Sequence, residues 1–211
     1  MEAIKNHGGL GIPIFKPREF NLDIIKRFKA AEDAGALAVG VDIDAASFKT
    51  MSLKGQAVGP KTIEELQELK SHLKVPFILK GIMNVESALS AVEAGADAIV
   101  VSNHGGRVMD HMPGTAEVLP EISNAVAGRI KVLVDGGIRE VIDIIKMLAL
   151  GADAVMIGRP ICIAAFGAGQ EGVSFYLHEK VKELKKAMIL TGCGSINQID
   201  PSIIFRKKGE R

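Results

Sequence analysis

Three stretches of the sequence follow one pattern: AAEDAGALAVGVD (residues 30–42), SAVEAGADAIVVS (90–102) and KMLALGADAVMIG (146–158). Each begins like the end of a helix, passes through a glycine turn and continues as a run rich in β-branched residues. We expect a left-handed backbone at the glycine that ends each helix. These glycines are Gly35, Gly95 and Gly151. The pattern predicts three copies of a helix–turn–strand unit.

A second pattern alternates with the first. GIPIFKP (11–17), KVPFILKG (74–81) and RIKVLVDGG (129–137) are short, continuous apolar runs, which are typical of strands buried on both faces. Apolar residues at three- and four-residue spacing predict helices between these runs. The predicted helices are residues 21–34, 62–73, 84–94, 114–126 and 139–150.

This βαβα order favours parallel strands with right-handed crossovers, and a TIM (β/α)8-type barrel over a doubly wound sheet. Only six strands are found, whereas a closed barrel has eight. We therefore expect an incomplete barrel that lacks its first two strands, forming one domain over residues 1–211 and closed by a long helix at 171–192. Unpaired sheet edges predict self-association into a homo-oligomer.

The composition is that of a globular protein, with 47% hydrophobic and 24% charged residues. The net charge of +1 and the 4% aromatic content argue against a nucleic-acid partner. Two cysteines provide no disulfide framework, and no run reaches the roughly 18 apolar residues of a membrane helix. We expect a cytoplasmic protein without a membrane partner, and a solvated basic tail at 205–211.

Polar residues follow the predicted strands, and in barrels of this kind the chemistry lies at the carboxyl ends of the strands. These residues are Lys16, Asp42, Lys80, His104, Asp135 and Arg159. Chance could place a polar residue after two or three of the strands, but hardly after all six. The pattern therefore indicates a functional site.

The last two strand ends predict a phosphate site. In VDGGIR (134–139), Gly136 and Gly137 let backbone N–H groups approach an anion, and a helix N-terminus follows. In IGRP (157–160), Gly158 precedes Arg159, whose guanidinium can bind phosphate oxygens in pairs. The alternative is two ordinary glycine turns beside a surface arginine.

His104 lies in SNHGGR (102–107), where two glycines open space beside it. A neutral imidazole can accept a proton near physiological pH, and Arg107 can grip a carboxylate. Asp42 is either the partner of this imidazole or a helix N-cap. Lys80 is either a Schiff-base lysine or a cation facing a developing anion. The five histidines have no metal-ligand spacing, so we expect no metal.

VSNHGGR (101–107), PGTAEVLPEI (113–122), KVLVDGGIR (131–139) and LALGADAVMIGRP (148–160) together resemble the FMN-dependent 2-hydroxy acid dehydrogenases and oxidases. This family includes glycolate oxidase and lactate oxidase. The resemblance runs from about Pro13 to Ile203. It implies an FMN cofactor and the oxidation of a small (S)-2-hydroxy acid, such as lactate or glycolate, to the 2-oxo acid, with an unspecified electron acceptor.

The resemblance also implies a role for each residue of the site. His104 would be the catalytic base, Asp42 its carboxylate partner and Arg107 the group that binds the substrate carboxylate. Lys80 and Ser102 would contact the flavin. The residues that would hold the ribityl chain and phosphate are Asp135, Gly136, Gly137, Arg139, Gly158 and Arg159.

The chain departs from the family pattern at several positions. Ile14 and Lys16 stand where the family commonly has glutamine and tyrosine, and Lys49 replaces a second substrate arginine. Two alternatives to the oxidoreductase therefore stay open. One is a flavin- or phosphate-binding barrel fragment without turnover. The other is an FMN-dependent isomerase similar to type 2 isopentenyl diphosphate isomerase.

Overall fold

The computed structural model describes residues 1–205, so the predicted basic tail lies outside the described residues from 206 onward. All six strands pair in parallel, and each lies beside the strands that precede and follow it in the chain. The strands are β1 (Ile14–Phe15), β2 (Val39–Asp42), β3 (Phe77–Ile82), β4 (Ala98–Val101), β5 (Lys131–Val134) and β6 (Ala154–Val155).

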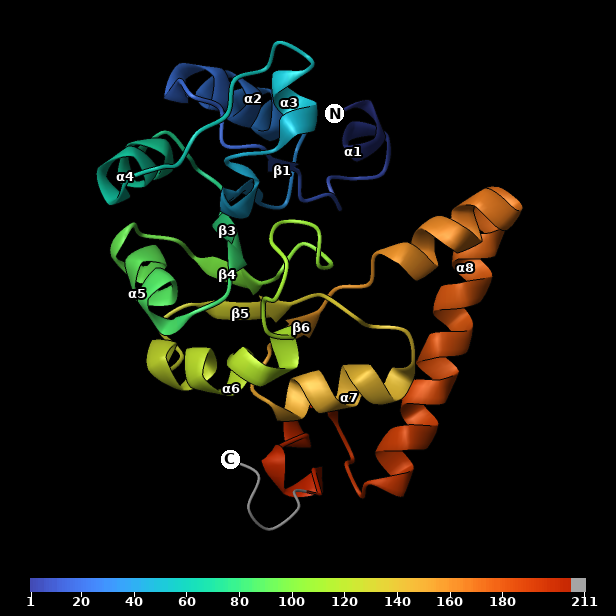
Figure 1. Ribbon diagram of the computed structural model, residues 1–211. Helices are drawn as coiled ribbons and strands as arrows, with labels where there is room; N and C mark the ends of the chain where they lie inside the picture. The colour runs from blue at the N-terminus through green and yellow to red at the C-terminus, as the bar shows by residue number, and fades with distance from the viewer. Residues whose placement is uncertain (206–211) are drawn as a thin grey trace.

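Helices follow the strands and form an outer layer around the curved sheet (Figure 1). A sheet whose strands keep sequence order belongs to a barrel, because a doubly wound sheet reverses order at its centre. The predicted partial barrel is therefore confirmed. The helices are α1 (Glu2–Asn6), α2 (Asn21–Asp33), α3 (Lys49–Ser52), α4 (Ile63–Ser71), α5 (Val85–Glu93), α6 (Thr115–Val126), α7 (Val141–Ala149) and α8 (Arg159–Leu190), with 3₁₀ turns η1 (Ile43–Ala45), η2 (Ile196–Gln198) and η3 (Pro201–Ile203).

Side chains alternate between the two faces of the sheet, as the geometry of a strand requires. One set packs outward under the helices in the main core, for example Val41, Leu79 and Ile99. The other set, including Ile78 and Val100, forms a smaller cluster on the inner face. The predicted turn glycines also have the expected left-handed backbone, with φ of 80°, 78° and 106° at Gly35, Gly95 and Gly151.

Two repeats carry an aspartate directly after the turn, and each aspartate fastens its unit to the preceding one. Asp97 accepts a hydrogen bond of 2.7 Å from the backbone N–H of Phe77 and also pairs with Lys70. Asp153 accepts one of 2.8 Å from the N–H of Val132. The sequence repeat thus encodes a side-chain link to the first residues of the neighbouring strand.

Replacing Asp97 with alanine should destabilise the fold by about 1–3 kcal/mol, because the buried N–H of Phe77 loses its acceptor. Asp97→Asn, which keeps a side-chain oxygen, should lose less stability.

Burial raises the pKa of Asp97, but the hydrogen bonds from Lys70 and Phe77 outweigh it, so the pKa lies below its ordinary value. The stabilisation is therefore present above about pH 4 and is lost as the pH falls through the folded pKa. Urea unfolding across this range measures it, and equal stability of the alanine variant and wild type would contradict it.

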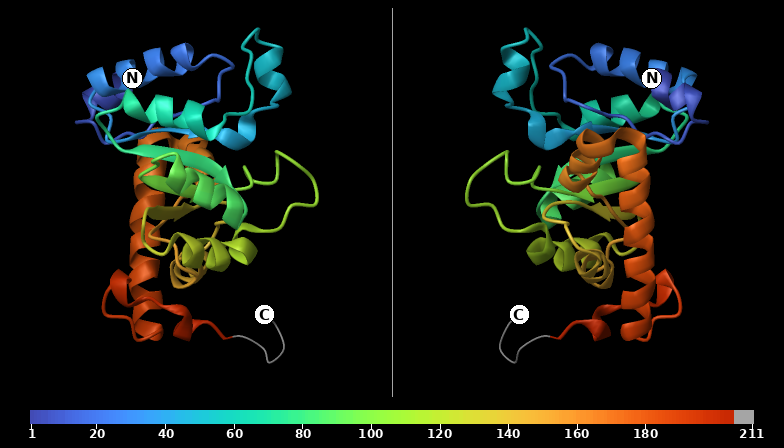
Figure 2. Two further views of the ribbon diagram at one scale, coloured as in Figure 1. Left: turned by 90° about the vertical axis from the view of Figure 1, so that its left-hand side faces the viewer. Right: turned by 90° about the vertical axis from the view of Figure 1, so that its right-hand side faces the viewer.

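The C-terminal part differs from the sequence prediction. The predicted closing helix at 171–192 is present as the second half of α8, but α8 begins earlier, at Arg159, and bends where Ala168 and Gly169 leave helical geometry. Its second half crosses α7 (Figures 1 and 2), where Leu184 and Met188 pack on a separate small core around Ile145 and Cys193. Within residues 1–205, no helix is both long and apolar enough to cross a membrane.

Candidate functional site

A ring of polar side chains continues the inner face of the sheet beyond its apolar layer. On β2, Gly40 and Asp42 lie two residues apart, and on β3, Ile78 and Lys80 do the same. Alternate residues of a strand share a face. The residue two positions after the last apolar residue of the inner face therefore lies on the same face, at the carboxyl edge of the sheet. The polar side chains reached in this way are Lys16, Asp42, Lys80, Ser102 and Asp135, and the corresponding position after β6 is Gly158, which has no side chain.

Lysine and aspartate side chains pair across this edge. Lys16 Nζ lies 2.5 Å from Asp42 Oδ2. Lys80 Nζ donates to Ser102 Oγ at 2.8 Å and lies 3.2 Å from Asp135 Oδ2 and 3.6 Å from Asp42 Oδ1. Lys80 therefore stands as a cation between two carboxylates, which fits better with charge stabilisation than with a free amine ready for Schiff-base formation.

Asp42 is buried, with 6% of its surface exposed. Burial acts to raise the pKa of this carboxyl, but the hydrogen bond from Lys16 and the positive charge of Lys80 outweigh it, so its pKa lies below the ordinary value. The carboxylate thus stays ionised at neutral pH and offsets the two ammonium groups beside it.

The loop after β4 explains the unusual composition of NHGG. Three successive residues have a left-handed backbone, with φ of 57° at His104, 69° at Gly105 and 76° at Gly106. Glycine tolerates this region readily, whereas histidine occupies it only where the surroundings hold it. Here the His104 N–H donates to Ser102 Oγ at 3.1 Å, and Asn103 Oδ1 accepts from the Gly106 N–H at 3.2 Å.

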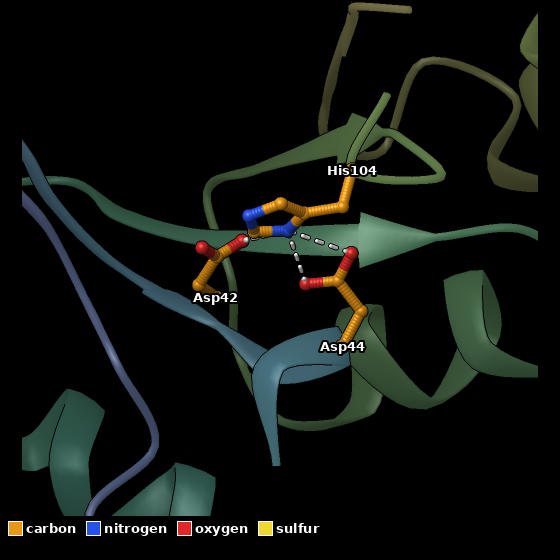
Figure 3. Close-up of side chains that lie close together, drawn as sticks. All are labelled: Asp42, Asp44 and His104. Atoms are coloured by element: carbon orange, nitrogen blue, oxygen red, sulfur yellow. Dashed lines mark hydrogen bonds and ion pairs between the residues drawn. The ribbon is translucent and has the colours of Figure 1, made fainter. Parts of the chain in front are cut away.

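The imidazole of His104 is 9% exposed and lies between two carboxylates (Figure 3). Both oxygens of Asp44 lie 3.1 Å from Nδ1, whereas Asp42 Oδ1 lies 3.6 Å away. The hydrogen bond to the imidazole is therefore made by Asp44, which the sequence analysis did not single out. Its only signal in the sequence was a second aspartate two residues past the end of β2.

The ligand atoms of Asp42, Asp44 and His104 all lie within 4.8 Å of one another, a grouping that sequence spacing does not reveal. Such a set resembles the donors of a metal ion. Here, however, Lys16 and Lys80 already neutralise Asp42, and Asp44 is engaged with the imidazole. These contacts favour a cluster of hydrogen bonds and ion pairs over a metal site.

The predicted phosphate loops lie at the other end of the edge. Gly136 and Gly137 are left-handed, with φ of 95° and 76°. The N–H groups of Arg139 and Glu140, at the start of α7, donate to the helix's own Asp143. The N-terminus of α8, with its N-cap Gly158 and first residue Arg159, lines the same cavity as these glycines. We therefore expect the positive end of α8, and not that of α7, to contribute to anion binding here.

A cavity of about 460 Å³ joins the two ends, a size that suits a small cofactor. It brings together most of the predicted site residues, while Ser102 is fully buried beneath Lys80. Lys49, the proposed replacement for a substrate arginine, is exposed at the start of α3 and is not among the lining residues. Those that line it are Asp42, Lys80, His104, Arg107, Asp135, Gly136, Gly137, Arg139, Gly158 and Arg159, together with Ile14, Gly105, Ile138, Met156 and Cys162.

A partial β/α barrel with a polar strand edge, an imidazole and a cationic end defines a barrel that can bind an anionic cofactor. The sequence profile described as FMN-dependent dehydrogenase matches residues 49–206. The chain therefore belongs to this family, whose cofactor is FMN.

Related proteins agree. The chain is 35% identical to the peroxisomal (S)-2-hydroxyacid oxidase GLO4 of Arabidopsis thaliana, over 96% of this chain and 64% of the relative. It is 49% identical to an L-lactate oxidase of Nostoc sp., over 68% of this chain and 39% of the relative. A crystal structure of mandelate oxidase superimposes with a TM-score of 0.87 at 38% identity, covering 95% of this chain and 64% of that one. The matched regions thus cover 64% of two of these proteins and 39% of the third.

Three features of the cavity fit FMN. The buried Oδ1 atoms of Asp42 and Asp135 have no hydrogen-bond partner among residues 1–205, and an unpaired buried oxygen calls for a donor such as a hydroxyl. A Cβ added at Gly137 or Gly158 would meet nothing within 4 Å, so the backbone there is open to a ligand. Arg139 and Arg159 supply the positive charge that a phosphate needs.

Proposed function

We propose that the protein binds FMN in the barrel cavity and oxidises a small (S)-2-hydroxy acid, such as lactate or glycolate, to the 2-oxo acid. The observation that carries this proposal is the convergence of His104, Arg107 and Lys80 on one cavity whose far end is cationic. The names of the relatives, which are oxidases and dehydrogenases of 2-hydroxy acids, support it.

The contacts of three side chains suggest a separate role for each of them in the reaction. Arg107, whose Nε donates to the His104 carbonyl at 3.0 Å, is held beside the base and would bind the substrate carboxylate. His104 would accept a proton from the substrate at Nε2, because Nδ1 is engaged with Asp44. Bound FMN would supply the acceptor for the two electrons that leave the substrate. Lys80 would stabilise negative charge near the carboxyl edge of β3.

Anaerobic addition of 2-hydroxy acids to the FMN-loaded protein tests this function. L-lactate, glycolate or (S)-mandelate should bleach the flavin absorbance, and D-lactate serves as the stereochemical control. If FMN binds but none of these acids bleaches it, the proposal of turnover is wrong and a binding fragment without catalysis remains. Failure to bind FMN at all would contradict both. The isomerase alternative is disfavoured by the hydroxy-acid relatives.

Arg159→Ala should weaken FMN affinity by about 10- to 100-fold, since it removes a charge-assisted contact to phosphate. Riboflavin, which has the same ring and ribityl chain but no phosphate, should bind wild type and variant alike. Quenching of flavin fluorescence measures both affinities. Arg27→Ala, an exposed arginine on α2, is the matched control. An equal loss for FMN and riboflavin would remove Arg159 from the phosphate site.

A cytoplasmic location and self-association stay predictions. Apolar residues exposed on the second half of α8, such as Phe175 and Ile189, agree with an interface between copies of the chain.

A further inference from the structure

Asp44 has a geometry that its sequence position alone does not explain. It lies in the 3₁₀ turn η1, with its side chain only 10% exposed, and both of its oxygens are 3.1 Å from His104 Nδ1. Asp42, at 3.6 Å from the same nitrogen, is bound instead to Lys16 at 2.5 Å. The two aspartates therefore have different partners.

The space for Asp44 is made by a bulge in β3. The register with β4 shifts between Lys80 and Ile82, and Gly81 adopts φ +102°. A Cβ at Gly81 would lie 2.5 Å from Asp44 Cγ and 2.6 Å from its Cβ, far inside van der Waals contact. The missing side chain of Gly81 thus lets the turn that carries Asp44 lie directly against the strand.

The imidazole is held from its other sides as well. The Phe48 ring packs against it in a T-shaped arrangement, with ring centroids 4.9 Å apart and an interplanar angle of 70°. The backbone N–H of His104 donates to Ser102 Oγ, and that hydroxyl in turn accepts from Lys80. With backbone and ring fixed, the remaining freedom is the choice of which nitrogen carries the proton, and this depends on the partner of Nδ1.

We propose that Asp44 is a positioning residue that holds His104 in the tautomer with the proton on Nδ1, leaving Nε2 free to accept a proton. A carboxylate oxygen can only accept a hydrogen bond, so Nδ1 must donate. Asp42, by contrast, serves mainly to neutralise Lys16 and Lys80. The catalytic consequence rests on the proposed function. The tautomer itself does not, because it can be observed in the protein without flavin or substrate.

Nitrogen-15 NMR of histidine-labelled protein tests the tautomer directly, with the His104 signals assigned by their loss in His104→Ala. Wild type should show a protonated Nδ1 and an unprotonated Nε2 in the neutral ring. Asp44→Ala should shift the neutral ring toward a mixture, whereas Asp44→Asn, which keeps an accepting oxygen, should preserve the wild-type pattern. Asp42→Ala should leave the Nδ1–H tautomer in place. If Asp42→Ala mixes the tautomers and Asp44→Ala does not, the assignment is overturned.

Gly81→Ala provides an independent variant, since its methyl group would force Asp44 away from the imidazole. It should mix the tautomers as Asp44→Ala does, and an unchanged wild-type pattern in folded Gly81→Ala would contradict the bulge argument.

In protein that reduces flavin, Asp44→Ala should lower the rate of flavin reduction by about 10- to 100-fold with little change in the apparent affinity for the acid. A loss of affinity at unchanged rate would instead assign Asp44 to substrate binding. If wild type does not reduce flavin, the proposed function fails while the NMR result still decides the role of Asp44.

Discussion

Flavin reduction by a 2-hydroxy acid should slow by about 10²- to 10⁴-fold when His104 is replaced by alanine, the range expected for loss of a positioned general base. Arg107 donates to the backbone carbonyl of His104, and the Nδ1 atom of the imidazole is already oriented by a carboxylate. FMN should remain bound, because the phosphate end is formed by other loops. Anaerobic stopped-flow measurement of flavin bleaching, together with FMN titration, gives both quantities.

The matched control is His178→Ala, an exposed imidazole on α8 that hydrogen-bonds within its own helix. It should reduce flavin at the wild-type rate. Loss of FMN binding in His104→Ala at unchanged folding would show that the imidazole supports the cofactor, and the assigned role as base would be wrong.

Phe28→Ala should reduce the free energy of unfolding by about 3–5 kcal/mol, the usual cost of truncating a buried phenylalanine. Phe28 on α2 is 1% exposed, and its ring packs against those of Phe15 and Phe77, with centroids 5.8 and 5.9 Å away. It therefore joins the helix layer to β1 and β3. Urea unfolding measures the loss through the transition midpoint at an unchanged slope.

Phe166→Ala is the control for this prediction, because Phe166 on α8 is 94% exposed. Its effect should stay within about 0.5 kcal/mol. If Phe28→Ala cost no more than Phe166→Ala, α2 would not be packed on the sheet as described.

The repeated turn–strand pattern made the parallel strand order predictable, because periodicity and turn glycines are local properties of the sequence. Strand length was less predictable. The strands β1 and β6 lie at the two edges of the sheet, and only two residues of each are paired. How many residues pair depends on the neighbouring strand, which the local sequence does not specify. The first half of α8 was missed because GRPICIAAFGAGQ (158–170) contains the proline and glycines of a loop. Proline is well tolerated in the first turn of a helix, which is where Pro160 lies.

The candidate site could be predicted as a set of residues but not as a set of contacts. Alternation along each strand brings Asp42, Lys80 and Asp135 to one edge, and sequence reasoning can follow that rule. The partnership of Asp44 with His104 could not be deduced in this way. It depends on a bulge at Gly81, in a strand that lies 37 residues further along the chain (81 minus 44).

The bend at Ala168 and Gly169 gives the two halves of α8 different neighbours. The half that begins at Arg159 borders the cavity, whereas the half that contains Leu184 belongs to the small core on α7. In a straight helix, a shift of the small C-terminal core would move Arg159 as well. Because the helix is interrupted at Ala168 and Gly169, its two halves can shift separately. Sequence changes or thermal loosening at the far end of this helix can therefore accumulate without displacing Arg159, the residue proposed to bind the phosphate.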